Sequence, residues 1–160
     1  MLATLMRIEL KKGKDGRDSL ACVRDDGSRT WAKLHPFFPM HDLTHCAVES
    51  VLGFRNAFFG LVASGWEIDD FAARGAAQRM PAEALWAEHI VGMFDLERAS
   101  GQVLSARDMN ALLPAGCHQL TDIELAAIKR LRGRLAQQWT SMAPGETMAV
   151  SFPVDSTPKA

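Results

Sequence analysis

The fold is decided by residues 6–34, MRIELKKGKDGRDSLACVRDDGSRTWAKL, which combine alternating apolar and polar residues with two turn sequences. Met6, Ile8 and Leu10 share one face of an extended chain, because successive side chains of a strand point to opposite sides. The turn sequences KDGR and DDGS separate this segment from SLACVR and RTWAKL. Asp-Gly turns between alternating segments are a strong hairpin signal. The sequence therefore predicts a three-stranded antiparallel β-meander over about residues 1–34.

Two prolines mark the end of the meander. Pro36 and Pro39 cannot continue a central strand, but proline suits the first turn of a helix. The apolar sequence that follows predicts one helix over about residues 40–64. Gly53 and Gly60 weaken this helix, and Gly65 is its expected stop.

A second helix is predicted from Pro81 to about Ala99, with Gly101 as its stop. Its large apolar residues fall within one half of a helical wheel. They are Leu85, Trp86, Ile90, Met93, Phe94 and Leu96. His89 lies inside this apolar arc, so its side chain is expected to point into the core.

The last third of the chain completes the fold prediction. Thr121 and Glu124 form a capping-box pattern, which predicts a helix over residues 122–141. Apolar residues then alternate over 147–153, which predicts a final strand followed by a frayed tail, 154–160. The order of strands, helices and one strand indicates an α+β fold. The final strand is expected to join the N-terminal meander, and the sheet to pack against about three main helices.

Length and charge limit the classes of protein and partner. The chain has 160 residues, 48% of them hydrophobic and 23% charged, which is ordinary for one globular domain with a real core. We therefore expect a single domain over residues 1–160. The formal net charge of -1 gives no electrostatic reason to expect a nucleic acid or a membrane as partner.

The cysteines and the apolar runs predict a cytoplasmic location. Cys22, Cys46 and Cys117 are odd in number and lack a CxxC spacing, which disfavours a disulfide framework and a thiolate zinc site. The apolar run in residues 1–14 is short and interrupted by charges, unlike a signal peptide. The most apolar segment, residues 51–64, is too short to cross a bilayer.

Residues 35–49, HPFFPMHDLTHCAVE, hold three of the five histidines. His41 and His45 are four residues apart, so on a helix they share a face about 6 Å apart along the axis. Two imidazoles so placed can bind one ion at the ~2.0–2.1 Å that zinc prefers. The helix dipole also disfavours a protonated His41 in the first turn, and neutral imidazole is the form that binds metal. The stretch therefore predicts a divalent metal site, with zinc as the expected ion.

Two histidines need a further ligand. His89 is the first choice, because it is expected to point inward from the second helix. Glu49 is better placed to accept a hydrogen bond from the outer nitrogen of His45. Other candidates for the missing ligand lie on the second helix, in the connection before it, or just before the first helix. They are Glu83, Glu97, Glu67, Asp69, Asp70 and His35.

The sequence HDLTH resembles the HDxxH core of the zinc-associated motif in the ubiquinone-biosynthesis protein family. That pattern continues with eleven residues and a glutamate. The match covers His41, Asp42 and His45, and Ala57 stands at the position of the glutamate. The same residues resemble the HExxH of zinc metallopeptidases, with Asp42 at the position of the base. The resemblance implies that HDxxH on a helix is a known way to hold a metal, and nothing about the activity of this chain.

Two classes of function follow from these residues. The first is a metal-dependent hydrolase of a small molecule, in which metal-activated water reacts and Asp42 or Glu49 moves protons. The second is a non-enzymatic interaction module, in a homodimer, with structural histidines and a proline-pinned helix start. An enzyme site is expected to keep an open coordination position and a cleft beside His41 and His45. An interaction module is expected to show a wide apolar patch instead.

Overall fold

Four strands form one antiparallel sheet in the computed structural model, which describes residues 4–154. The strands are β1 (Thr4–Lys11), β2 (Ser19–Val23), β3 (Arg29–Lys33) and β4 (Thr147–Val154). Their order across the sheet is β3-β2-β1-β4. The predicted meander and the predicted return of the last strand to it are both confirmed.

The register explains why one face of the sheet is apolar. Ile8 pairs with Cys22 on β2 and with Val150 on β4. Met6, Ile8 and Leu10 are buried, as their alternation predicted, and the residues between them face outward. β4 extends the predicted strand by one residue. The rest of the predicted tail, 155–160, lies outside the described residues.

The predicted helix over residues 40–64 is wrong in one respect, because the chain forms two helices there. These are α1 (Phe38–Leu52) and α2 (Phe58–Ala63). Gly53 has φ 69° and its N–H donates to the Glu49 carbonyl, which ends α1. A left-handed residue after the last turn is a common helix stop, and glycine adopts it without steric cost. Gly53 therefore terminates the helix rather than weakening it.

The other two long helices match their predictions. α4 (Ala82–Ser100) ends at Gly101, and α6 (Asp122–Ser141) has the predicted bounds. The Thr121 hydroxyl caps α6 by accepting from the Glu124 N–H. The shorter helical segments are η1 (Lys14–Gly16), η2 (Ile68–Ala72), α3 (Ala76–Arg79) and α5 (Ala106–Leu112). Within residues 4–154, no helix is both long and apolar enough to cross a membrane.

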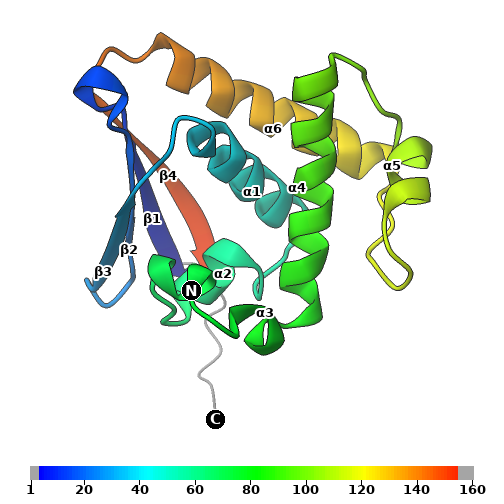
Figure 1. Cartoon of the computed structure of the whole chain (residues 1–160), viewed down its shortest axis with the longest axis horizontal. Coiled ribbons are helices and arrows are strands. Elements are labelled where there is room, and N and C mark those ends of the chain that lie inside the picture. The colour runs from blue at the N-terminus through cyan, green and yellow to red at the C-terminus, as the bar shows by residue number, and fades with distance from the viewer. Residues whose placement is uncertain (1–3, 155–160) are drawn as a thin grey trace.

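The helix α1 is central to the arrangement. The three long helices lie on one side of the sheet (Figure 1). One apolar cluster joins the sheet to α1, α2 and α6, and includes Leu43 and Cys46. A second joins α1 to α4, α5 and α6, and includes Ala47 and Val48. α1 is therefore enclosed on two sides, and its charged residues need polar partners within the protein.

The packing between α1 and the sheet makes a prediction for two buried thiols, Cys46 on α1 and Cys22 on β2. Burial raises the pKa of Cys22 and of Cys46 to about 12, so neither forms the reactive thiolate near neutral pH. We expect both to resist a thiol reagent at pH 8 in the native protein and to react once guanidinium unfolds it. Mass spectrometry of labelled peptides would measure this. Fast labelling of either thiol in the native protein would contradict the packing described here.

Candidate metal centre

The helix α1 presents His41 and His45 on the face that meets α4. Their ring centroids are 4.9 Å apart. The His45 side chain is 2% exposed and that of His41 is 17% exposed. The shared helical face that the spacing predicted is confirmed.

A carboxylate on α4 lies against both imidazoles. Glu88 Oε1 is 3.1 Å from His45 Nε2, and Glu88 Oε2 is 3.9 Å from His41 Nε2. The possible ligand atoms of these three residues all lie within 4.8 Å of one another. Ligands of a tetrahedral zinc ion at ~2.0–2.2 Å from the metal are roughly 3.4 Å apart, a value between these two separations. All three side chains are of types that zinc binds, and Glu88 is half-exposed, so it has room to move.

The prediction that His89 points into the core is wrong. His89 is exposed, and Glu88 beside it occupies the position facing α1. The predicted buried face of this helix was centred on its large residues, but two of them are exposed. Leu85 is 43% exposed and Leu96 is 47% exposed. The observed buried face of α4 includes the small residues Ala84 and Ala87. Its other members are Ile90, Val91 and Phe94.

The other predicted ligand candidates on α4 have different partners. Glu83 accepts from the N–H of Asn56 at 2.8 Å, and Glu97 accepts from the N–H of Leu104 at 2.6 Å. Both carboxylates therefore fix loops rather than facing the histidines. In the connection before α4, Glu67 and Asp70 form the capping box of η2. Asp69 in the same connection, and His35 just before α1, line the cavity described below.

Each imidazole is held from behind by a second carboxylate. His41 Nδ1 lies 2.7 Å from Asp95 Oδ2, and His45 Nδ1 lies 3.1 Å from Glu49 Oε2. With Nδ1 donating to these carboxylates, each Nε2 faces Glu88. Metal-binding histidines commonly have such a carboxylate partner, which fixes the tautomer and the orientation of the ring. The predicted contact of Glu49 with His45 is confirmed, whereas Asp95 was not predicted.

Asp95 has a sequence signal that was overlooked. It follows Glu88 by seven residues, a spacing that returns to the same helical face after two turns. Its other oxygen, Oδ1, is buried and has no hydrogen-bond partner among residues 4–154. A buried carboxylate oxygen without a partner is costly, while the contact of Oδ2 holds the His41 ring in place.

Glu49 connects His45 to α2. It is fully buried, and its Oε1 accepts from the N–H of Phe59 at 2.9 Å and from that of Gly60 at 3.4 Å. Burial raises the pKa of Glu49, while His45 and these two amides oppose the shift. Glu49 therefore holds His45 and the start of α2 in one arrangement.

Burial and hydrogen bonding have opposite effects on the pKa values of His45 and Glu88. Burial alone lowers the pKa of His45, but its hydrogen bonds with Glu49 and Glu88 outweigh burial and raise it. The same contact with His45 lowers the pKa of Glu88 despite burial. The contacts with Glu49 and Glu88 therefore favour a second proton on His45. A metal ion must displace this proton to bind Nε2, so metal binding would release a proton.

Asp42 has a different environment from the other carboxylates. It is 5% exposed, and it makes no hydrogen bond with its side chain among residues 4–154. Burial raises the pKa of Asp42 to about 7, against the opposing effect of His45 and His41. A carboxyl that changes its charge near neutral pH suits proton transfer.

A cavity of about 680 Å³ opens beside these residues, with His41, Asp42, His45 and Glu88 in its wall. Such a volume lies within the roughly 300–1,000 Å³ of small-molecule sites. Most of the remaining wall is apolar and comes from the sheet, α2, η2 and α4. It includes Leu20, Phe58, Ile68, Phe71, Met80 and Leu85. The cavity therefore joins an apolar chamber to a group of convergent polar side chains.

Comparisons of the chain with protein-family models, with curated proteins and with solved structures found no match. The likeness of HDLTH to two metal-binding motifs thus extends no further than His41, Asp42 and His45. What these residues do has to be argued from the geometry around them.

Proposed function

We propose that this protein binds one zinc ion through His41, His45 and Glu88 and acts as a metal-dependent hydrolase on a small, largely apolar substrate. One observation carries the proposal. Both imidazoles are backed by carboxylates and turn their Nε2 atoms toward Glu88 at the wall of a cavity. Two histidines and one glutamate form a known ligand set of catalytic zinc sites, in which a fourth position stays open.

The chemistry follows from the residues around the ligands. A zinc ion held by these residues would supply a Lewis acid that lowers the pKa of water toward neutrality. Asp42, whose pKa burial raises to about 7, would take up the proton of the attacking water. Glu49 lies behind His45 and away from the cavity wall, so it acts by orienting that ring. Asp95 does the same for His41.

The cavity favours the enzymatic alternative over an interaction module. Its apolar wall would hold the body of a substrate, while the polar group at one end would meet the bond to be hydrolysed. A structural metal site would instead be closed by four protein ligands. An ester or amide with an apolar acyl group would match a cavity that is apolar over most of its wall and polar at one end.

Two neighbouring residues of α4 provide a matched test of the metal site. We expect Glu88→Ala to weaken zinc binding by more than about a hundredfold, because it removes a direct ligand. His89→Ala is expected to leave zinc affinity unchanged, because His89 is exposed and outside the cluster. Isothermal titration of metal-free, untagged protein would measure both affinities and the stoichiometry. Wild type that binds no zinc, or equal losses in the two variants, would contradict the proposed site.

The hydrolase activity needs a separate measurement. Zinc-loaded protein is expected to hydrolyse nitrophenyl esters, with a preference for apolar acyl chains over acetate. A chelator is expected to abolish the reaction and added zinc to restore it. Binding of one zinc ion without hydrolysis of any ester or amide in such a panel would support a metal site and contradict the hydrolase.

A further inference from the structure

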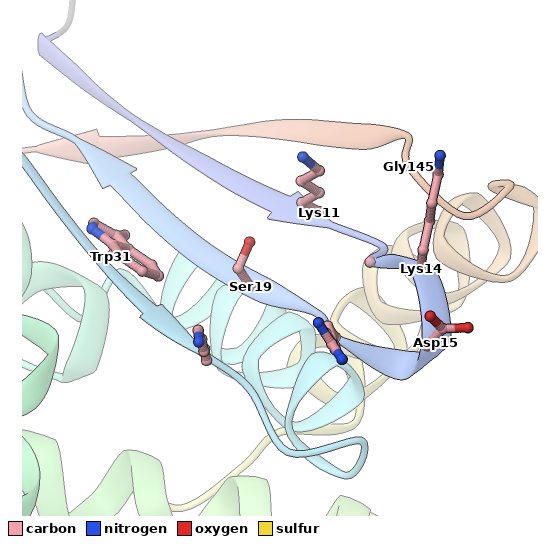
Figure 2. Close-up of a pocket in the computed structure, with 9 residues that line it drawn as sticks. Lys11, Lys14, Asp15, Ser19, Trp31 and Gly145 are labelled. Carbon is pink, nitrogen blue, oxygen red and sulfur yellow. The ribbon is translucent and has the colours of Figure 1, made fainter.

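A second recess lies on the outer face of the sheet, the side that the helices do not cover. Its volume is about 400 Å³, and the end of the sheet and the turn between β1 and β2 line it (Figure 2). Its lining includes four cationic side chains and one carboxylate. They are Lys11, Lys14, Arg17, Lys33 and Asp15.

The strand register places a hydroxyl between two of the cations. Lys11 on β1 pairs with Ser19 on β2, and Ser19 pairs with Lys33 on β3. These three residues form one row across the sheet, with neighbouring strands about 4.8 Å apart. Lys11 and Ser19 stand on the same side of the sheet in Figure 2. Two flexible ammonium groups can therefore converge on one anion above the serine hydroxyl.

The cations of this recess outnumber its one carboxylate. Within residues 4–154, none of Lys11, Lys14, Arg17 and Lys33 forms an ion pair. The Asp15 carboxylate lies at the turn below Lys14, apart from Ser19 and Trp31 (Figure 2). By contrast, Lys12 faces the opposite direction and donates to two backbone carbonyls near the end of α6. The recess is thus a local concentration of positive charge on a chain whose net charge is -1.

An aromatic side chain adjoins the cations. Trp31 lines the recess and is 56% exposed, and it precedes Lys33 by two residues on the same face of β3. This spacing sets the two residues roughly 6.6 Å apart along the strand. Exposed indole rings next to basic groups provide a surface on which a planar ring can stack.

From this juxtaposition we infer that the outer recess binds a phosphorylated ligand that carries a planar ring, as a nucleotide does. The phosphate lies over Ser19 between Lys11 and Lys33, with Lys14 and Arg17 at its side. The ring stacks on Trp31. A free nucleotide and one unit of a single strand share this chemistry. The inference is independent of the proposed metal site.

The test uses charge-matched variants of the full chain. Adenosine monophosphate, adenosine and inorganic phosphate would be titrated calorimetrically into wild type and into Lys11→Ala/Lys14→Ala. Lys33 is left intact because it also borders the larger cavity. The control, Arg130→Ala/Arg134→Ala, removes the same charge from exposed positions on α6. We expect the lysine variant to lose at least about tenfold in affinity for the nucleotide and the control to lose little.

Further measurements test the ring and the phosphate of the ligand separately. They also distinguish a free nucleotide from a single strand. Trp31→Ala is expected to weaken binding of the nucleotide but not of inorganic phosphate, and added salt to weaken both. A short single-stranded oligonucleotide that binds more tightly than the nucleotide would identify a strand as the source. Weaker binding would identify the free nucleotide. The inference is overturned if wild type binds neither the nucleotide nor inorganic phosphate. It is also overturned if the lysine variant and the arginine control bind the nucleotide equally well. Trp31→Ala with unchanged affinity for the nucleotide would remove the stacking part.

Discussion

Glu49→Ala is expected to lower the free energy of unfolding by about 3–5 kcal/mol, the typical cost of removing one partner from a buried charged pair. The Glu49 carboxylate is fully buried and pairs with His45, which is also buried. It also accepts from the N–H groups of Phe59 and Gly60 at the start of α2. Alanine would leave an imidazole and two amides without their acceptor. Urea unfolding of metal-free protein, followed by circular dichroism, would measure the loss.

Glu49→Gln separates this structural role from the proposed metal site. The glutamine oxygen can still accept from the Phe59 N–H, so its amide NH₂ must face His45 Nδ1. His45 would then carry its proton on Nε2, the atom that the proposed zinc ion needs. We expect a smaller loss of stability than in Glu49→Ala and a loss of zinc affinity of roughly 10–100-fold.

Both expectations for Glu49 can fail independently. Glu49→Ala with wild-type stability would mean that its buried contacts contribute little to the fold. Glu49→Gln with unchanged zinc affinity would mean that the tautomer of His45 is not set by this residue. Glu124→Gln is a suitable control, because Glu124 accepts from His118, a histidine outside the cluster of His41, His45 and Glu88.

The strands and most helix ends could be predicted because their signals are local. The Asp-Gly turns and the alternation of Met6, Ile8 and Leu10 define the hairpins within a few residues of one another. Gly101 and the Thr121 cap likewise act within one turn of the helix they end or begin. The break after α1 was missed because Gly53 is compatible with a weakened helix or with a stop. The choice depends on whether α2 gains by folding back onto Glu49.

The candidate site was predictable along α1 but not across to α4. The spacing of His41, His45 and Glu49 is a property of one helix. The rotation of α4 about its axis depends on which of its sides packs against α1. Ala87 lies in the cluster that joins the two helices, whereas Leu85 and Leu96 are exposed. That rotation replaces His89 by Glu88 in the site. To predict a ligand on a second helix, one must know how the two helices pack against each other. The periodicity of the sequence does not contain this information.

Asp42→Asn is expected to abolish most of the proposed hydrolysis while making the metal-free protein more stable. Asp42 is the only acid of α1 that lines the cavity. As the proposed proton acceptor it contributes about 10²–10⁴-fold to the rate, which asparagine cannot supply. The change keeps the size of the side chain and removes a carboxylate that makes no hydrogen bond within residues 4–154. Zinc affinity is expected to change far less than kcat.

The stability gain has a defined dependence on pH. Burial raises the pKa of Asp42 to about 7 in the folded protein, from an unfolded value of 3.8. The folded state therefore holds the proton more tightly, and wild-type stability falls as pH rises from about 4 to 7. Asparagine removes this contribution. The variant should gain nothing below pH 4, gain progressively up to pH 7, and keep an advantage of about 2–4 kcal/mol at pH 8.

Urea unfolding of both proteins at pH 4, 6 and 8, with chelator present, would measure this difference. A difference that stays constant with pH would mean that Asp42 titrates normally and is not held in a low-polarity site. A variant that is more stable at pH 8 and still hydrolyses esters would separate the buried carboxyl from catalysis. A residue that costs stability in the resting protein and is needed for turnover is instead what a proton acceptor beside an apolar cavity requires.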